Sequence, residues 1–75
     1  MLLPNKLFSY NESILCKLPV VLRELERKPY SVHELYKLVA RKMSGVSEYI
    51  EVLDCLYALG KIKYDEEVGV LRYVV

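Results

Sequence analysis

The sequence is poor in the residues that build metal centres and disulfide frameworks. It contains two cysteines, Cys16 and Cys55, a single histidine, His33, and no tryptophan. The cysteines form no C-x-x-C pair, so one chain cannot supply the four Cys and His ligands of a structural zinc site. We therefore expect no metal, no cofactor and no disulfide, and a cytosolic protein with reduced thiols.

Long apolar runs and an excess of charge of one sign are also missing. No stretch approaches the roughly 20 apolar residues of a membrane-spanning helix. Residues 1–3 are followed at once by Pro4-Asn5-Lys6 instead of the apolar segment of a secretory signal. A net charge of +1 creates neither the basic field that draws a protein to nucleic acid nor a strong acidic field. These absences predict a cytoplasmic protein without a membrane segment.

Apolar residues are what the chain has in surplus. With 75 residues it is long enough for one domain, and a domain of that size buries only about 60% of its unfolded surface. Its hydrophobic fraction of 53% nevertheless lies above the usual range. Some of this apolar surface is therefore expected to face another chain.

The first ten residues predict an extended arm. Apolar side chains recur there with interruptions, and Pro4 argues against a helix. The chain is thus expected to consist of an extended apolar arm, residues 1–10, and a folded domain, residues 11–75.

A first helix is expected to follow the arm. Asn11 or Ser13 can cap its start, and Lys28-Pro29 ends it. Pro19 falls inside the helical pattern and predicts a kink or a restart near residue 18. The apolar positions at helical spacing are Ile14, Leu15, Leu18, Val21, Leu22 and Leu25.

The second helix has the clearest start signal. Residues 31–34, Ser-Val-His-Glu, match the capping box S-x-x-E. Basic residues gather in the C-terminal half, where the helix dipole favours cations, and Ser44-Gly45 ends the helix. The expected apolar face is Leu35, Leu38, Val39 and Met43.

A third helix is expected from Ser47 to Leu59, with Gly60 as its C-terminal signal. The expected core face is Val46, Ile50, Leu53 and Tyr57, with Tyr49 and Leu56 at its edge. The residues expected to face outward are Glu48, Glu51, Val52, Cys55 and Ala58.

Two strands complete the chain. Residues 61–64 and 70–74 alternate polar and apolar side chains, and the polar loop 65–69 between them ends in glycine. Helix, helix, turn, helix and hairpin is the order of an α+β winged helix-turn-helix domain. The predicted fold is therefore three helices followed by a C-terminal β-hairpin wing, with the extended arm in front.

No catalytic constellation is present. Ser31 and His33 are neighbours, but Ser31 is expected to cap a helix and His33 to point elsewhere from its first turn. Glu48, Glu51 and Asp54 lack a histidine or a glycine-rich turn to help hold an ion. We interpret them first as a solvated face and second as an acidic docking surface. The chain is therefore expected not to be an enzyme.

The charge of the third helix argues against its binding DNA. A recognition helix lies between phosphates and normally brings cations or amides to base edges. Residues 47–59 carry three carboxylates and no Lys or Arg, and the hairpin loop is acidic as well. A winged-helix DNA-binding transcriptional regulator, the alternative function, would use basic residues of the second helix and the hairpin. These residues are Lys37, Arg41, Lys61, Lys63 and Arg72.

Three segments resemble a known family. Residues 2–15, LLPNKLFSYNESIL, are similar to the opening of the small middle components of ABC-three-component (ABC-3C) systems. Residues 31–39 and 53–73 are similar to later segments of that family, above all through Leu-Tyr-Ala-Leu-Gly at 56–60. The resemblance implies a non-enzymatic, winged-helix-like adaptor of a prokaryotic conflict or anti-phage system. It would act beside an ABC-type ATPase of the RecN/SMC kind and a variable third component.

The first hypothesis is therefore a protein-interaction subunit that bridges the ATPase and the third component. Its docking residues are expected in the arm and on the outward face of the third helix. These candidates are Leu2, Leu3, Leu7, Phe8, Val52 and Cys55. An arm folded back on the core and an arm that makes a homodimer are the alternatives to docking on a partner. The regulator is the second hypothesis, and its affinity for DNA would collapse with salt.

Overall fold

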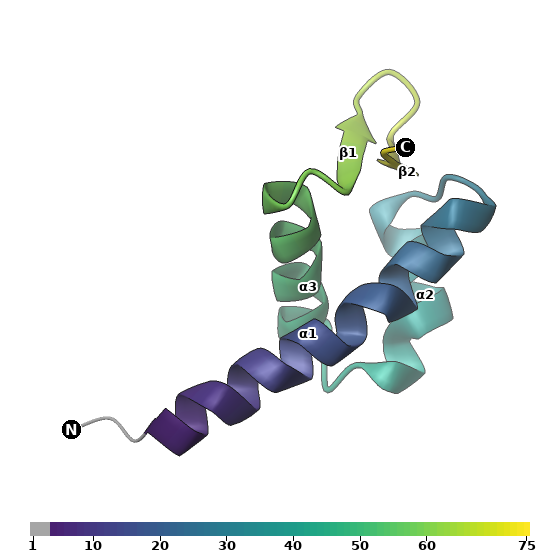
Figure 1. Cartoon of the computed structure of the whole chain (residues 1–75). Coiled ribbons are helices and arrows are strands. Elements are labelled where there is room, and N and C mark those ends of the chain that lie inside the picture. The colour runs from purple at the N-terminus through teal and green to yellow at the C-terminus, as the bar shows by residue number, and fades with distance from the viewer. Residues whose placement is uncertain (1–3) are drawn as a thin grey trace.

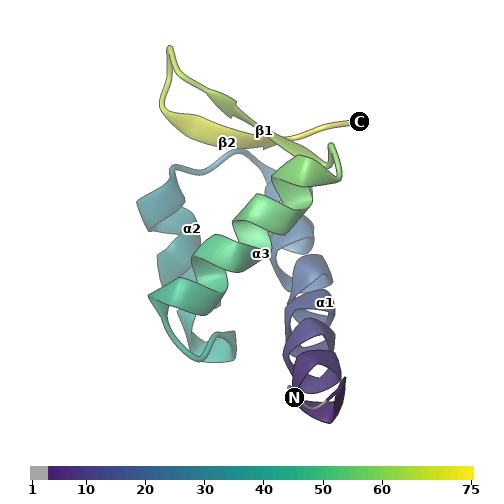
Figure 2. The same ribbon diagram turned by 90° about the vertical axis from the view of Figure 1, so that its left-hand side faces the viewer.

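Three helices form a cluster that a β-hairpin covers at one end (Figure 1 and Figure 2). This computed structural model describes the backbone of residues 4–75 and the side chains of residues 12–75. The elements are α1 (Pro4–Arg27), α2 (Val32–Val39), the 3-10 turn η1 (Ala40–Lys42), α3 (Val46–Ala58), β1 (Ile62–Asp65) and β2 (Val70–Tyr73). This order confirms the α+β class and is consistent with a winged-helix arrangement.

The start of α1 differs from the prediction. The helix begins at Pro4, so the expectation of an extended arm is wrong for residues 4–10, while residues 1–3 lie outside the described part. Proline suits the first helical position, because the N–H that it lacks would have no partner there and its fixed φ matches the helix. Figure 1 shows the first turns of α1 extending away from the other elements.

Pro19 does not divide the first helix. α1 continues through it to Arg27, so the predicted restart near residue 18 is absent, whereas the end before Pro29 is confirmed. Pro19 lies on the exposed side of α1. The carbonyl of Leu15, which loses its helical donor to the proline ring, therefore faces the side where water can satisfy it.

The capping box of α2 is present as predicted. The Glu34 backbone N–H donates to Ser31 Oγ at 3.1 Å, and the Ser31 N–H donates to Glu34 Oε1 at 3.2 Å. After Val39 the chain tightens into η1 and then turns at Gly45 into α3.

The hairpin gains a third backbone partner that the sequence did not predict. β1 and β2 are antiparallel, with a register from Ile62 opposite Tyr73 to Asp65 opposite Val70. On the other edge of β2, the Leu71 N–H donates to the Tyr30 carbonyl at 2.7 Å, and the Tyr30 N–H donates back to Leu71 at 3.4 Å. The segment between α1 and α2 is thereby fixed to the sheet.

The buried face of α3 differs in part from the predicted one, although Leu53 is buried as expected. Tyr49, Val52 and Leu56 are at most 1% exposed, whereas Ile50 and Tyr57 lie in solvent. Because apolar residues occupy two sides of this helix, periodicity alone does not select the side that packs against α1. The core comprises Ile14, Val21, Leu25, Leu35, Val39, Met43, Tyr49, Val52, Leu53, Leu56, Ile62 and Leu71.

Candidate functional site

Glu48 fixes the start of α3 against α1. Its Oε1 accepts hydrogen bonds from Lys17 Nζ at 2.7 Å and from the Ser44 N–H at 2.9 Å, and its Oε2 accepts one from Ser13 Oγ at 2.9 Å. The Lys17 bond is the largest cause, ahead of those from Ser44 and Ser13, that lowers the pKa of Glu48 to about 2. Glu48 is thus tied into the fold, and the interpretation of this carboxylate as part of a solvated face is wrong.

One side of α3 presents large apolar side chains to solvent. Val46, Ile50 and Tyr57 are 57%, 43% and 66% exposed. Their spacing of four and seven residues places them within about 40° of one another around a helix with 3.6 residues per turn. We name these three residues the α3 stripe. Apolar surface gathered in this way is typical of a contact site for another molecule.

Carboxylates border the α3 stripe. Glu51 and Asp54 are exposed, and Asp54 lies one helical turn beyond Ile50 on an adjoining part of the helix surface. Residues 46–58 contain no Lys or Arg. An apolar stripe with an acidic border is complementary to an amphipathic segment that carries Lys or Arg beside its apolar residues.

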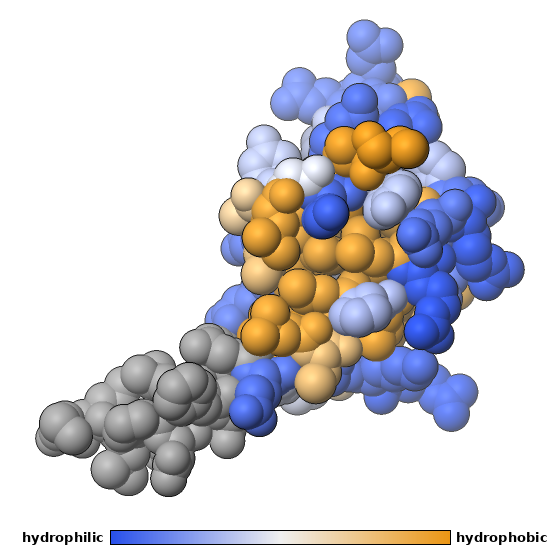
Figure 3. Space-filling model, in the orientation of Figure 1, coloured by the Kyte–Doolittle hydropathy of each residue, from blue (hydrophilic) through white to orange (hydrophobic). Residues whose placement is uncertain are grey.

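Apolar surface is exposed elsewhere too. Figure 3 shows hydrophobic side chains gathered over the region where α1 and α3 meet. Leu15 on α1 and Leu59 just after α3 are among the exposed large apolar residues. The high hydrophobic fraction of the sequence is therefore only partly used by the core.

Of the predicted docking residues, the structure describes the side chains of Val52 and Cys55. Val52 is fully buried, and Cys55 is partly buried against the core, so the expectation that both face outward is wrong. Leu7 and Phe8 belong to the first turns of α1, and their side chains lie outside the described ones. Leu2 and Leu3 precede the described residues altogether.

The basic residues predicted for nucleic acid divide between two parts of the fold. Lys37 and Arg41 are exposed on α2 and η1, whereas Lys61 and Lys63 are exposed on the hairpin. The fifth residue, Arg72, is engaged within the hairpin, where its Nε donates to an oxygen of Asp65 at 3.0 Å.

Asp65 organises the hairpin loop. Its Oδ1 accepts from the backbone N–H groups of Glu67 and Val68 at 3.1 and 3.3 Å. The hydrogen bond from Arg72, followed by those backbone bonds, lowers the pKa of the Asp65 carboxyl. Asp65, one of the acidic residues that argued against DNA binding by the hairpin, therefore also stabilises the turn between β1 and β2.

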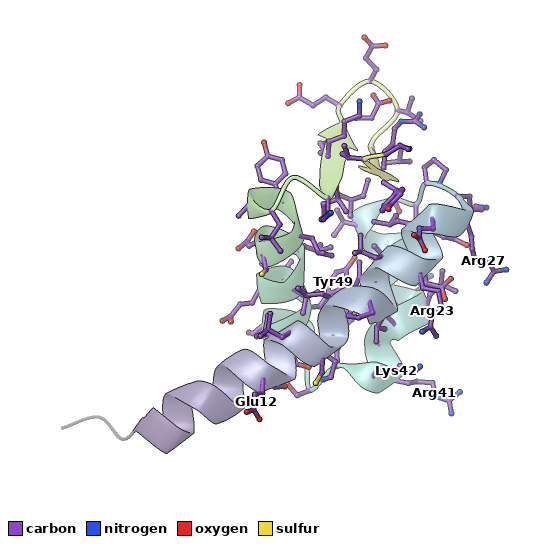
Figure 4. All side chains as sticks on the ribbon, in the orientation of Figure 1. Glu12, Arg23, Arg27, Arg41, Lys42 and Tyr49 are labelled. Carbon is purple, nitrogen blue, oxygen red and sulfur yellow. The ribbon has the colours of Figure 1, made fainter. Side chains whose placement is uncertain are left out.

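Two basic residues of α1 were missed by the sequence reasoning. Figure 4 shows Arg23 and Arg27 of α1 projecting on the same side of the molecule as Arg41 and Lys42 of η1. All four side chains are exposed. The available signal was the distribution of charge along the chain: residues 20–45 contain six Lys or Arg and three Glu, whereas residues 46–75 contain three Lys or Arg and six Asp or Glu.

The described residues contain no cluster of three or more His, Cys, Asp and Glu side chains that is arranged to hold a metal ion. Ser31 is engaged as the N-cap of α2, and His33 is exposed in its first turn, as predicted. Over the described range, none of the helices combines the length and the apolar character needed to cross a membrane.

The comparison with known proteins gives one family. No curated protein and no solved structure matches the chain. The family described as ABC-three component (ABC-3C) system Middle Component 7 matches it over residues 3–71, which confirms the resemblance seen in its N-terminal, central and C-terminal segments. The chain belongs to the ABC-3C system Middle Component 7 family.

Proposed function

We propose that this chain is a non-enzymatic adaptor in the cytoplasm of a prokaryote, where it bridges an ABC-type ATPase of the RecN/SMC kind and a variable third component in anti-phage defence. Membership in a middle-component family implies partner components. The observation that carries the proposal is the α3 stripe, because three large apolar side chains on one side of a helix suit a protein partner.

The composition of α3 supports a protein partner over DNA for this helix. Val46 and Ile50 offer no hydrogen bond to a base edge, and the neighbouring Glu51 and Asp54 would repel phosphates. The same carboxylates favour a partner segment with Lys or Arg beside its apolar residues. We therefore assign the α3 stripe to one of the two partner components and not to an operator sequence.

A second docking element is needed for a bridging role. The first turns of α1 extend away from the helix cluster (Figure 1), and they carry the predicted docking residues Leu7 and Phe8. The other partner component would bind there. A bridge of this kind keeps the two partners on separate parts of one small protein.

Co-purification of the tagged chain with the ATPase and the third component of its own system tests the proposal. The variant Ile50→Gln/Tyr57→Ser should lose one partner and keep the other, because it removes apolar contact area at exposed positions without touching the core. Leu38→Gln is the matched control, since Leu38 is also half exposed, at 50%, but lies on α2. Both variants should unfold at the wild-type temperature.

Three outcomes would contradict the assignment. If the stripe variant retains both partners, α3 is not a docking helix. If the Leu38→Gln control loses a partner equally, exposed apolar area in general is responsible and not the stripe. If the wild-type chain is a dimer and the stripe variant a monomer, the stripe joins two copies of this chain.

A further inference from the structure

Four exposed cations from α1 and η1 project on one side of the molecule, and none of them belongs to α3 or to the hairpin. Arg23 and Arg27 come from α1, and Arg41 and Lys42 come from η1 (Figure 4). We name these four residues the basic face. The corresponding side of the space-filling view is hydrophilic (Figure 3).

The cations of the basic face are largely uncompensated. Among the described side chains, only Arg27 of the four has an ion-pair partner, Glu24 at 3.6 Å, and its side chain is still 72% exposed. Glu26 on α1 is the other carboxylate near this end of the helix. Glu34 is engaged in the capping box at the opposite end of α2 from η1. A net positive field therefore remains on this side.

We propose that the basic face binds the sugar-phosphate backbone of nucleic acid. Three of the four residues are arginines, whose planar guanidinium groups match phosphate oxygens. All four are long, exposed side chains that can reach a charged backbone without rearrangement of the core. The proposal concerns a different surface from the α3 stripe and does not depend on the adaptor role.

An acidic protein fits this side less well than a phosphate backbone. A protein interface usually has an apolar or aromatic centre with charges at its rim. Leu38 is the only exposed large apolar residue in the described part of α2, and one leucine does not make such a centre. Contacts to phosphates need charge alone, because they position a protein on the duplex without reading its sequence.

The expected binding is weak, non-specific and dependent on salt. Neutralising about four phosphates gives a slope near −3.6 for log K against log salt concentration, and non-specific complexes have Kd values of about 10⁻⁴–10⁻⁶ M at physiological salt. Nucleic acid bound on α1 and η1 would leave the stripe on α3 free. The adaptor could then hold a protein partner and a nucleic acid at once.

Fluorescence anisotropy of a labelled random-sequence 30-base-pair duplex, titrated with the full chain over a series of salt concentrations, tests the proposal. Arg41→Gln/Lys42→Gln should weaken binding at low salt by at least about tenfold and reduce the slope by about 1.8. Lys61→Gln/Lys63→Gln is the matched control, because it removes the same charge from the hairpin. It should change the affinity less than about threefold.

The outcomes separate the alternatives. A loss of duplex binding in Arg41→Gln/Lys42→Gln, the η1 variant, but not in Lys61→Gln/Lys63→Gln, the hairpin variant, supports the basic face as the binding site. Selective loss in the hairpin variant would assign the contact to the wing and overturn the proposal, and so would equal losses or an absence of binding at low salt. Competition by polyglutamate as efficient as by unlabelled duplex would show a site for acidic protein, which also overturns it.

Discussion

Lys17 of α1 and Glu48 of α3, 31 residues apart in the sequence, form an ion pair with Nζ 2.7 Å from Oε1 that joins the two helices. The same carboxylate accepts hydrogen bonds from the backbone N–H of Ser44, just before α3, and from the hydroxyl of Ser13. One side chain therefore sets where the candidate docking helix begins and how it lies against α1.

Replacing this carboxylate is expected to destabilise the fold. Glu48→Gln keeps the shape but removes the charge that Lys17 needs, and should lower the free energy of unfolding by about 1–2 kcal/mol at pH 7. For a domain of this size each kcal/mol lowers Tm by about 4–8 °C. Glu51→Gln is the matched control, because Glu51 is exposed on the same helix, and its Tm should stay within about 1 °C of wild type.

The contribution of Glu48 to the free energy of unfolding should depend on pH. Its pKa falls from an ordinary 4.5 to about 2 in the folded chain, so the unfolded chain takes up the proton first as the pH decreases. The stabilisation is complete above pH about 5 and is lost as the pH falls towards 2. Urea denaturation at several pH values should show the gap between wild type and Glu48→Gln closing over that window. A gap that is constant down to pH 2 would mean that the carboxylate charge is not what stabilises the helix.

The hydroxyl of Tyr49 provides a second prediction. It donates to the Val32 carbonyl at 2.7 Å, and the side chain is 1% exposed. Tyr49→Phe should cost about 1 kcal/mol at pH 7, measured by urea denaturation. Burial raises the pKa of Tyr49 to about 12 from 10, so the unfolded chain loses its proton first in base, and the stability of wild type falls between pH 10 and 12. The stability of Tyr49→Phe should not fall in this way between pH 10 and 12. An equal fall in both proteins would show that the ionisation of Tyr49 is not its cause.

Local signals in the sequence predicted local structure well. The capping box at Ser31, the helix end before Pro29 and the glycine after α3 were predictable, because each depends on hydrogen bonds between residues that are close in the chain. Pro4 gave the wrong prediction of an extended arm, because proline suits both an extended segment and the first residue of a helix.

The candidate surfaces were harder to predict because they depend on contacts between distant residues. α3 has two apolar sides, and only the packing of the whole core buries Val52 and leaves Ile50 exposed. Likewise, the sequence predicts a solvated Glu48 because its partner Lys17 is 31 residues away, and only the fold brings the two side chains into contact. The basic face combines side chains of α1 and η1, so the excess of Lys and Arg over residues 20–45 marks the segment but does not show that these side chains share one side.

The end of α3 allows a test of backbone conformation. Gly60 has a φ of 74°, and the hydrogen bonds from its N–H to Tyr57 and from the Lys61 N–H to Leu56 close the helix in a Schellman arrangement. Gly60→Ser should cost about 1 kcal/mol, since nothing lies within 4 Å of an added Cβ and only the left-handed conformation opposes it.

Gly45 supplies the matched control for that substitution. Its φ of 165° is extended, it occupies the N-cap of α3, and an added Cβ meets nothing within 4 Å. Serine is at least as good an N-cap as glycine, so Gly45→Ser should leave Tm unchanged or raise it slightly. Equal destabilisation by the two substitutions would show that the left-handed conformation of Gly60 does not set the cost of its replacement.

Truncation tests the docking role of the N-terminal residues. Deleting residues 1–8 removes Leu2, Leu3, Leu7 and Phe8, but leaves the core, in which the first buried residue of the described side chains is Ile14. Co-purification should show the loss of one partner component while the thermal unfolding temperature stays within about 2 °C. A truncated chain that retains both partners would exclude these residues as a dock, and a large fall in Tm would indicate that they stabilise the domain itself.

If the α3 stripe and the basic face act separately, variants in each should separate the two activities. Ile50→Gln/Tyr57→Ser changes no charge, so it should lose its protein partner and bind duplex DNA with an unchanged salt slope. Arg41→Gln/Lys42→Gln should do the reverse. The two measurements, co-purification with the partner components and anisotropy with the duplex, are made on the same preparations, with thermal unfolding as the control for folding. The loss of both activities in either well-folded variant would mean that protein and nucleic acid compete for one surface, and the chain would then switch between partners instead of bridging them.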